Sequence, residues 1–126
     1  MKKNKILLLE DNPIHREVIV DGLEDYGYEV RKAQNIAAAE KILEEFTPDL
    51  FVLDLVIETI KSAGIQFANK LRNDPEFKSI PILFISAHLD DLNREKIFPP
   101  DSNENILSKP FDFDQLINKI REVLRN

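Results

Sequence analysis

Three carboxylates, one hydroxyl and one lysine stand where apolar segments of the chain end: Glu10, Asp11, Asp54, Ser86 and Lys109. Adjacent carboxylates repel one another unless a cation lies between them. Oxygen ligands without histidine or cysteine suit a hard cation such as Mg²⁺. An aspartate is also a possible phosphoryl acceptor, and that transfer depends on positioning and on charge neutralisation. The set therefore predicts phosphoryl transfer to an aspartate, with Mg²⁺ and Lys109 neutralising the phosphoryl oxygens and the Ser86 hydroxyl bonding to one of them.

Such a site needs a scaffold that brings distant segments together. Short apolar runs alternate with longer stretches of helical periodicity, as expected for alternating strands and helices. The runs predict strands at residues 6–9, 28–31, 50–53, 80–85 and 105–107. Strict alternation implies a parallel sheet with right-handed crossovers and helices on both faces. The predicted fold is therefore α/β, a doubly wound five-stranded sheet whose crevice lies beyond the carboxyl ends of the strands.

The helix boundaries are marked by capping residues. Asn12 before Pro13 and then Asn35 predict two helix starts, and Asp112 with Gln115 fits a capping box for the last helix. A short helix is predicted at residues 90–98, before two prolines. The apolar face predicted for the first helix comprises Ile14, Val18, Ile19, Leu23 and Tyr26.

Composition excludes several classes of protein. A chain of 126 residues suits one domain, spanning residues 1–126, and without cysteine it forms neither disulfides nor thiolate metal sites. The net charge of −6 lies wholly in residues 1–60, which hold 7 basic and 13 acidic side chains, and it argues against nucleic acid as a partner. No run is long enough for a signal peptide or a membrane span. We therefore expect a cytoplasmic protein without membrane contact.

Four segments resemble the receiver domain of two-component response regulators. They are residues 6–13 (ILLLEDNP), 48–55 (PDLFVLDL), 81–87 (PILFISA) and 108–111 (SKPF). The resemblance covers essentially the whole chain, and the order and spacing of the segments make it specific. It implies the flavodoxin-like (βα)5 fold with strand order 2-1-3-4-5.

The resemblance also implies a role for each site residue. Asp54 corresponds to the phosphoacceptor. Mg²⁺ would be bound directly by Asp11 and Asp54, through water by Glu10, and by the backbone carbonyl of Val56. Ser86 would supply the hydroxyl that moves toward the phosphoryl group.

In the same way, Lys109 corresponds to the lysine that contacts the phosphoryl group, and its peptide bond to Pro110 is expected to be cis. The donor would be a phosphohistidine on a histidine kinase or phosphotransfer protein. The output surface would be the face made by the fourth helix, fifth strand and fifth helix, which would contact a downstream protein or a second receiver.

The chain departs from the family pattern in its loops and at one switch position. The loop over residues 57–63 is about two residues longer than usual, with Glu58 in place of a proline and Gly64 correspondingly displaced. Ile106 stands where the family commonly has an aromatic switch residue. Residues 99–104 replace the usual turn rich in glycine and alanine, so the output face is expected to be atypical.

Three functions are weighed. The leading one is a phosphorylatable stand-alone receiver, which is not counted as an enzyme. The second is a degenerate receiver that acts as a non-phosphorylated docking module. The third is an enzyme on the same fold. A flavin protein is disfavoured because Glu10 and Asp11 would repel a phosphate after the first strand. An aspartate-nucleophile phosphatase is disfavoured because no second aspartate stands two residues after Asp54.

Overall fold

The computed structural model describes residues 4–55, 57, 63–87 and 105–125. Five parallel strands form one sheet in the order β2-β1-β3-β4-β5, so the predicted doubly wound fold is confirmed. The strands are β1 (Lys5–Leu9), β2 (Glu29–Ala33), β3 (Leu50–Asp54), β4 (Ile82–Ser86) and β5 (Asn105–Ser108). The described helices are α1 (Pro13–Asp25), α2 (Ile36–Leu43), α3 (Ala63–Arg72) and α5 (Phe113–Arg125). The helix predicted at residues 90–98 lies outside the described part of the chain.

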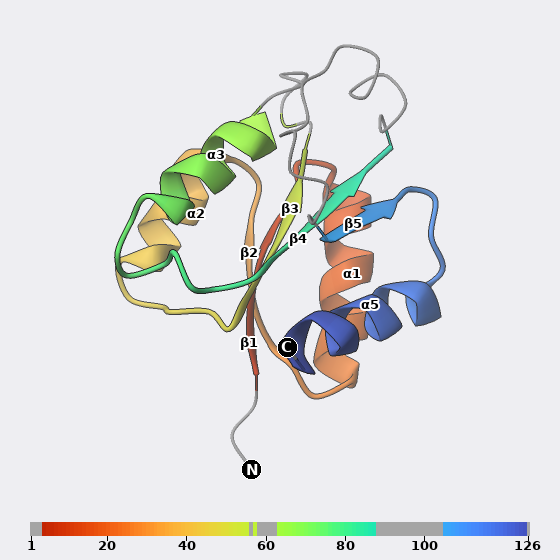
Figure 1. The fold of residues 1–126 in the computed structure, drawn as a ribbon. Coiled ribbons are helices and arrows are strands. Elements are labelled where there is room, and N and C mark those ends of the chain that lie inside the picture. The colour runs from red at the N-terminus through yellow and green to blue at the C-terminus, as the bar shows by residue number, and fades with distance from the viewer. Residues whose placement is uncertain (1–3, 56, 58–62, 88–104, 126) are drawn as a thin grey trace.

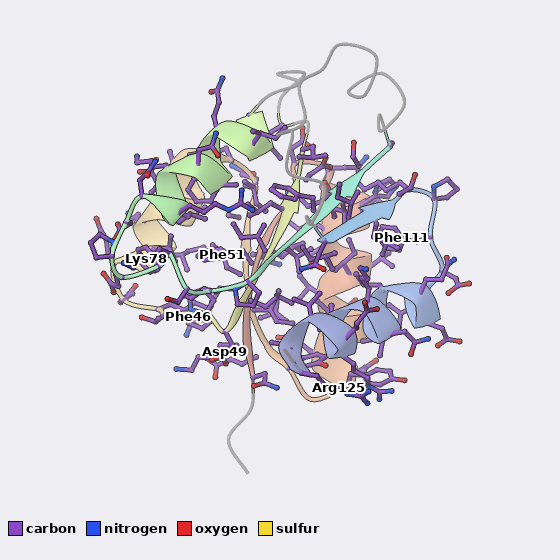
Figure 2. The ribbon with its side chains drawn as sticks, viewed as in Figure 1. Phe46, Asp49, Phe51, Lys78, Phe111 and Arg125 are labelled. Atoms are coloured by element: carbon purple, nitrogen blue, oxygen red, sulfur yellow. The ribbon has the colours of Figure 1, made fainter. Side chains whose placement is uncertain are left out.

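The helices form two layers, with α2 and α3 on one face of the sheet and α1 and α5 on the other (Figure 1). The central strands β1 and β3 are buried on both faces, which explains their unbroken apolar sequences. Side chains alternate along each strand. Leu7 and Phe51 therefore pack beneath α2 and α3, whereas Leu8 and Val52 pack beneath α1 and α5. Phe51 and Phe111 mark these opposite sides of the sheet (Figure 2).

The predicted helix caps are confirmed. The Asn12 side chain accepts hydrogen bonds from the backbone N–H groups of Ile14 and His15 at the start of α1. Asn35 accepts one from Ala38 at the start of α2. Asp112 and Gln115 bond reciprocally before α5, as a capping box requires. Within the described residues, no helix combines the length and apolar character needed to cross a membrane.

The prediction for the buried face of α1 was partly wrong. Ile19 and Leu23 are buried as expected, but Ile14 is 72% exposed and Val18 is 62% exposed. The reason is geometric. At 3.6 residues per turn, Ile14 and Val18 form a row on the side of the helix opposite Leu23. That row faces solvent because the sheet packs against the other side of α1.

Candidate functional site

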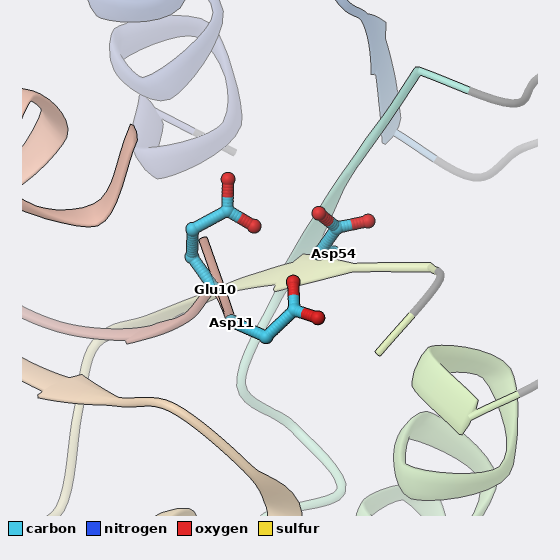
Figure 3. Close-up of side chains that lie close together, drawn as sticks. All are labelled: Glu10, Asp11 and Asp54. Atoms are coloured by element: carbon cyan, nitrogen blue, oxygen red, sulfur yellow. The ribbon is translucent and has the colours of Figure 1, made fainter. Parts of the chain in front are cut away.

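The carboxyl ends of β1, β3, β4 and β5 place the five predicted side chains at one edge of the sheet. Glu10 and Asp11 follow β1, Asp54 ends β3, and Ser86 ends β4. Lys109 follows β5. Figure 3 shows the carboxylates of Glu10, Asp11 and Asp54 turned toward one another. One carboxylate oxygen from each lies within 4.8 Å of those of the other two.

Three of these polar side chains are buried. Glu10 and Ser86 are fully buried, and Asp54 is 5% exposed. Charged groups are rarely buried unless they are paired, because removal from water disfavours the charged form. This degree of burial is therefore a strong indication that the edge of the sheet is built for binding or chemistry.

Lys109 supplies a positive charge to the carboxylates. Its Nζ lies 2.6 Å from Oε1 of Glu10 and 3.0 Å from Oδ2 of Asp54. Its backbone N–H donates to the carbonyl of Ser86 at 2.8 Å, and its peptide bond to Pro110 is cis, as predicted. Lys109 follows Asp54 by 55 residues in the sequence, and the fold brings the two side chains into contact.

The electrostatics of the site are unusual. Burial raises the pKa of Glu10 from 4.5 to about 8, and nearby Asp54 also raises it, while Lys109 lowers it. Burial alone would lower the pKa of Lys109, but the hydrogen bond to Glu10 and the charges of both carboxylates raise it overall. Burial and Asp54 therefore disfavour the ionised form of Glu10, whereas the two carboxylates favour the charged form of Lys109.

The residues fit a hard divalent cation. Oε2 of Glu10 is buried and has no hydrogen-bond partner among the described residues. A buried acceptor without a partner is costly, and a cation or its bound water would satisfy it. The three carboxylates offer oxygen ligands only, which is the donor set that Mg²⁺ prefers. The backbone of Val56, the fourth predicted ligand, lies outside the described residues.

Two neighbours of the acidic turn had not been predicted as site residues. Nη1 of Arg16 donates to the backbone carbonyl of Glu10 at 3.0 Å and lies 3.5 Å from that of Asp11. Nδ1 of His15 lies 3.5 Å from Oε1 of Glu10, although the His15 side chain is 55% exposed. The partners of Arg16 are backbone atoms, which have no sequence signature. The only available signal was its place one helical turn before Ile19 and Val20.

Gly64 lies directly against the backbone at the end of β3, beside Asp54. Its N–H donates to the carbonyl of Leu55 at 3.1 Å. A Cβ at this position would lie 2.3 Å from the carbonyl oxygen of Asp54 and 2.7 Å from Cα of Leu55. Only glycine allows this approach, so the displaced glycine still packs α3 directly against the end of β3. Glu58, in the longer loop before it, lies outside the described residues.

The remaining predicted positions have defined places. Ser86 is opposite Ser108 in the register of β4 and β5, and Ile106 is opposite Phe84. Ile106 is partly buried and packs against the cluster beneath α2 and α3. It is therefore a packing residue in this structure.

A mostly apolar cavity of about 480 Å³ adjoins the site. Val18 and Ile19 of α1 line one side, and Lys109, Pro110 and Phe111 line the other. Lys109 therefore separates this cavity from the carboxylates that it contacts. The cavity therefore extends from Lys109 to Val18 of the exposed row of α1.

Comparisons with known proteins agree with this architecture. A sequence model described as the response regulator receiver domain matches residues 6–121. The response regulator Rre1 of Synechocystis is 34% identical over 94% of this chain and 51% of its own length. The DNA-binding transcriptional regulator RpaA of the same organism is 30% identical over 96% of this chain and 49% of its own length. The chain thus spans about half the length of these curated relatives.

Solved structures show the same fold. The chemotaxis response regulator CheY4 of Vibrio cholerae has a TM-score of 0.79 at 21% identity, covering 97% of this chain and 99% of its own. The receiver domain of the sensor histidine kinase PA1611 of Pseudomonas aeruginosa has a TM-score of 0.83 at 23% identity. That match covers 99% of this chain and 100% of the other.

Proposed function

Because the chain belongs to the response regulator receiver domain family, we propose that it accepts a phosphoryl group on Asp54 and thereby switches a protein-interaction surface. The donor would be a phosphohistidine of a histidine kinase or phosphotransfer protein. One observation carries the proposal. The carboxylates of Glu10, Asp11 and Asp54 gather at the sheet edge, and Lys109 bridges two of them.

The transfer would proceed by direct displacement. A carboxylate oxygen of Asp54 attacks the phosphorus, a P–O bond forms, and the P–N bond to the donor imidazole breaks. The leaving imidazole nitrogen takes a proton from water. No general base is needed at Asp54, since an ionised carboxylate is already a nucleophile. The protein's task is to position the donor and to neutralise the charge on the phosphoryl oxygens.

The other site residues would share that task. Mg²⁺, when bound, neutralises phosphoryl oxygens, and it would be held by Asp11 and Asp54, with Glu10 acting through water and Val56 through its carbonyl. The ammonium of Lys109 would exchange its contact with Asp54 for one with a phosphoryl oxygen. The Ser86 hydroxyl, buried at the end of β4, would donate to another.

The donor protein needs a docking surface beside Asp54. We place it on the exposed row of α1, because Ile14 and Val18 are large apolar side chains left 72% and 62% exposed at the rim of the site. The adjoining cavity, with Pro110 and Phe111, extends this apolar surface toward Lys109.

For the output, the family resemblance favours the face that includes β5 and α5, which would contact a downstream protein or a second receiver. We propose that the receiver unit occupies the whole of residues 1–126.

Intact mass measurement tests the function. The chain would be incubated with Mg²⁺ and acetyl phosphate, a small donor that needs no docking surface. A single phosphate adduct is expected on the wild-type chain and none on Asp54→Asn. The absence of both an adduct and Mg²⁺ binding would overturn the proposal and favour the degenerate docking module instead.

A further inference from the structure

We propose that Arg16 is the residue that positions the acidic turn for a divalent cation. Its guanidinium holds the backbone carbonyls of Glu10 and Asp11, so that the two carboxylates are presented to the cation together. This inference rests on the metal-binding part of the proposed function, but it does not depend on phosphoryl transfer. Arg16 would not touch the cation or the phosphoryl group.

The contacts of Arg16 are specific to this turn. Nη1 donates to the carbonyl of Glu10 at 3.0 Å and makes a longer contact of 3.5 Å with that of Asp11. Within the described part of the chain, these carbonyls are its only hydrogen-bond partners, and no carboxylate lies within 4.0 Å of it. The guanidinium of Arg16 therefore hydrogen-bonds to backbone carbonyls and is not paired with a carboxylate. Such contacts stabilise a main-chain conformation.

The position of Arg16 in α1 explains how it reaches the turn. It lies on the same side of the helix as Ile19, Val20 and Leu23, the three residues that α1 buries. Arg16 is therefore the first inward-facing residue of the helix, at the level where the core ends and the site begins. Its side chain is directed toward the end of β1 and not into solvent, and it is half-buried there.

The turn is held from both ends, and among the described residues Arg16 is the side chain that bonds to its carbonyls. The N–H of Glu10 donates to the carbonyl of Ala33 at 3.0 Å, which fixes the turn to β2. The Asn12 side chain caps α1, and the Asn12 backbone carbonyl accepts from the N–H of Arg16 at 2.9 Å. Without the guanidinium, these two end anchors would remain, but the carbonyls of Glu10 and Asp11 would lose their contact with Arg16.

Two effects of removing Arg16 have opposite signs, which makes the test decisive. Loss of positioning weakens cation binding, and loss of an outer partner of a metal ligand typically costs about 10-fold or more in affinity. Loss of one nearby positive charge strengthens cation binding, because less repulsion opposes the incoming ion. The proposal requires the first effect to exceed the second.

The experiment is a calorimetric titration of the unphosphorylated chain with MgCl₂. We expect Arg16→Met, which keeps the apolar stem, to weaken Mg²⁺ binding roughly 10-fold. Arg16→Lys, which restores the charge and one donor, should recover roughly half of that loss on a logarithmic scale. Arg125→Met is the matched control, since it removes the same charge from an exposed position at the end of α5. It should stay within about twofold of wild type.

A kinetic measurement separates positioning from general damage. With acetyl phosphate, Arg16→Met should need roughly 10-fold more Mg²⁺ for half-maximal phosphorylation but reach the wild-type maximal rate. Equal or tighter Mg²⁺ binding by Arg16→Met would overturn the inference, as would an unchanged Mg²⁺ requirement with a lower maximal rate. If Arg16→Met does not fold, the Arg16→Lys titration decides in the same way. A wild-type chain that binds Mg²⁺ but takes no phosphoryl group would overturn the proposed function alone.

Discussion

The central strands contain two regions that differ in chemistry although both are buried. Along their middles, Leu7, Leu8 and Phe51 are fully buried and apolar. One residue beyond β1, Glu10 is equally buried but carries a carboxyl group whose pKa burial raises to about 8. Asp54 repeats this arrangement at the end of β3, with 5% exposure.

The difference shows that burial has opposite consequences within a few residues of one strand. In the middle, removing apolar surface from water stabilises the fold. At the carboxyl end, removing carboxylates from water opposes folding unless a cation or proton compensates. The sheet therefore gains stability in its middle and holds a destabilised polar cluster at its end. Such a cluster is able to respond strongly to an incoming cation or phosphoryl group.

The largest effect should come from the middle of the sheet. Leu8→Ala would leave a cavity beneath α1 and α5, and we expect the free energy of unfolding to fall by roughly 3 kcal/mol. Urea denaturation would measure it. In the fraction that remains folded, Mg²⁺ affinity should match wild type. Weaker Mg²⁺ binding by the folded variant would show that the two regions are not separable.

Gly64→Ala should damage both regions. The new Cβ would clash with the carbonyl oxygen of Asp54 and with Cα of Leu55, so the backbone at the end of β3 must move. We expect a loss of roughly 2 kcal/mol in the free energy of unfolding, together with weaker Mg²⁺ binding. Denaturation and calorimetry on the same samples would measure both.

Gly27→Ala provides the control for that substitution. Gly27 has φ of +96° with no atom near the position of a Cβ, so alanine there adds backbone strain alone. We expect a loss of about 1 kcal/mol from the strain and no change in Mg²⁺ affinity. If both glycine variants bound Mg²⁺ as wild type does, the close approach of Gly64 to Asp54 would have no role in the site.

The raised pKa of Glu10 gives the polar end its own pH dependence. Between pH 4.5 and about 8, the folded chain keeps a proton on Glu10 that the unfolded chain has released. The folded state binds more protons, so stability without Mg²⁺ should fall as pH rises through this window. Thermal melts across the window would measure the fall.

The slope of stability against pH can be assigned to Glu10 by two measurements, one with the Glu10→Gln variant and one with Mg²⁺ bound. Glutamine cannot ionise, so we expect Glu10→Gln to remove most of the slope and to exceed wild type in stability at pH 8. Saturating Mg²⁺ should reverse the slope in wild type, because metal ligands must be deprotonated and binding then strengthens with pH. A slope of the same size in Glu10→Gln would assign it to another group.

The sequence predicted the scaffold well because its signals are local. Apolar runs marked all five strands to within about two residues, and the asparagine caps of α1 and α2 have local hydrogen-bonding partners. The gathering of Glu10, Asp11 and Asp54 followed from topology, since the carboxyl ends of parallel strands share one edge.

What could not be predicted depends on how elements pack. In α1, Ile14 and Val18 have the same spacing as Ile19 and Leu23, so periodicity cannot say which row faces the sheet. Packing against the sheet decides it, since Ile19 and Leu23 lie in one core cluster with side chains of β1. The role of Arg16 depended on that same rotation of the helix.

The smallest effect on stability, and the most informative about partners, should come from the exposed row of α1. Ile14→Ser with Val18→Ser removes apolar surface that is already in water, so we expect stability to change by no more than about 0.5 kcal/mol. Phosphorylation by acetyl phosphate should keep its wild-type rate, because the site itself is unaltered.

Transfer from a protein donor should respond differently. A histidine kinase that phosphorylates the wild-type chain should act on the double variant at least about 10-fold more slowly, since large apolar side chains are the usual anchors of an interface. Glu24→Ser, an exposed substitution on the same helix, should leave that rate unchanged. An equal loss of rate with acetyl phosphate would mean that Ile14 and Val18 support the phosphorylation site itself. An unchanged rate with the kinase would exclude this row of α1 as the docking surface.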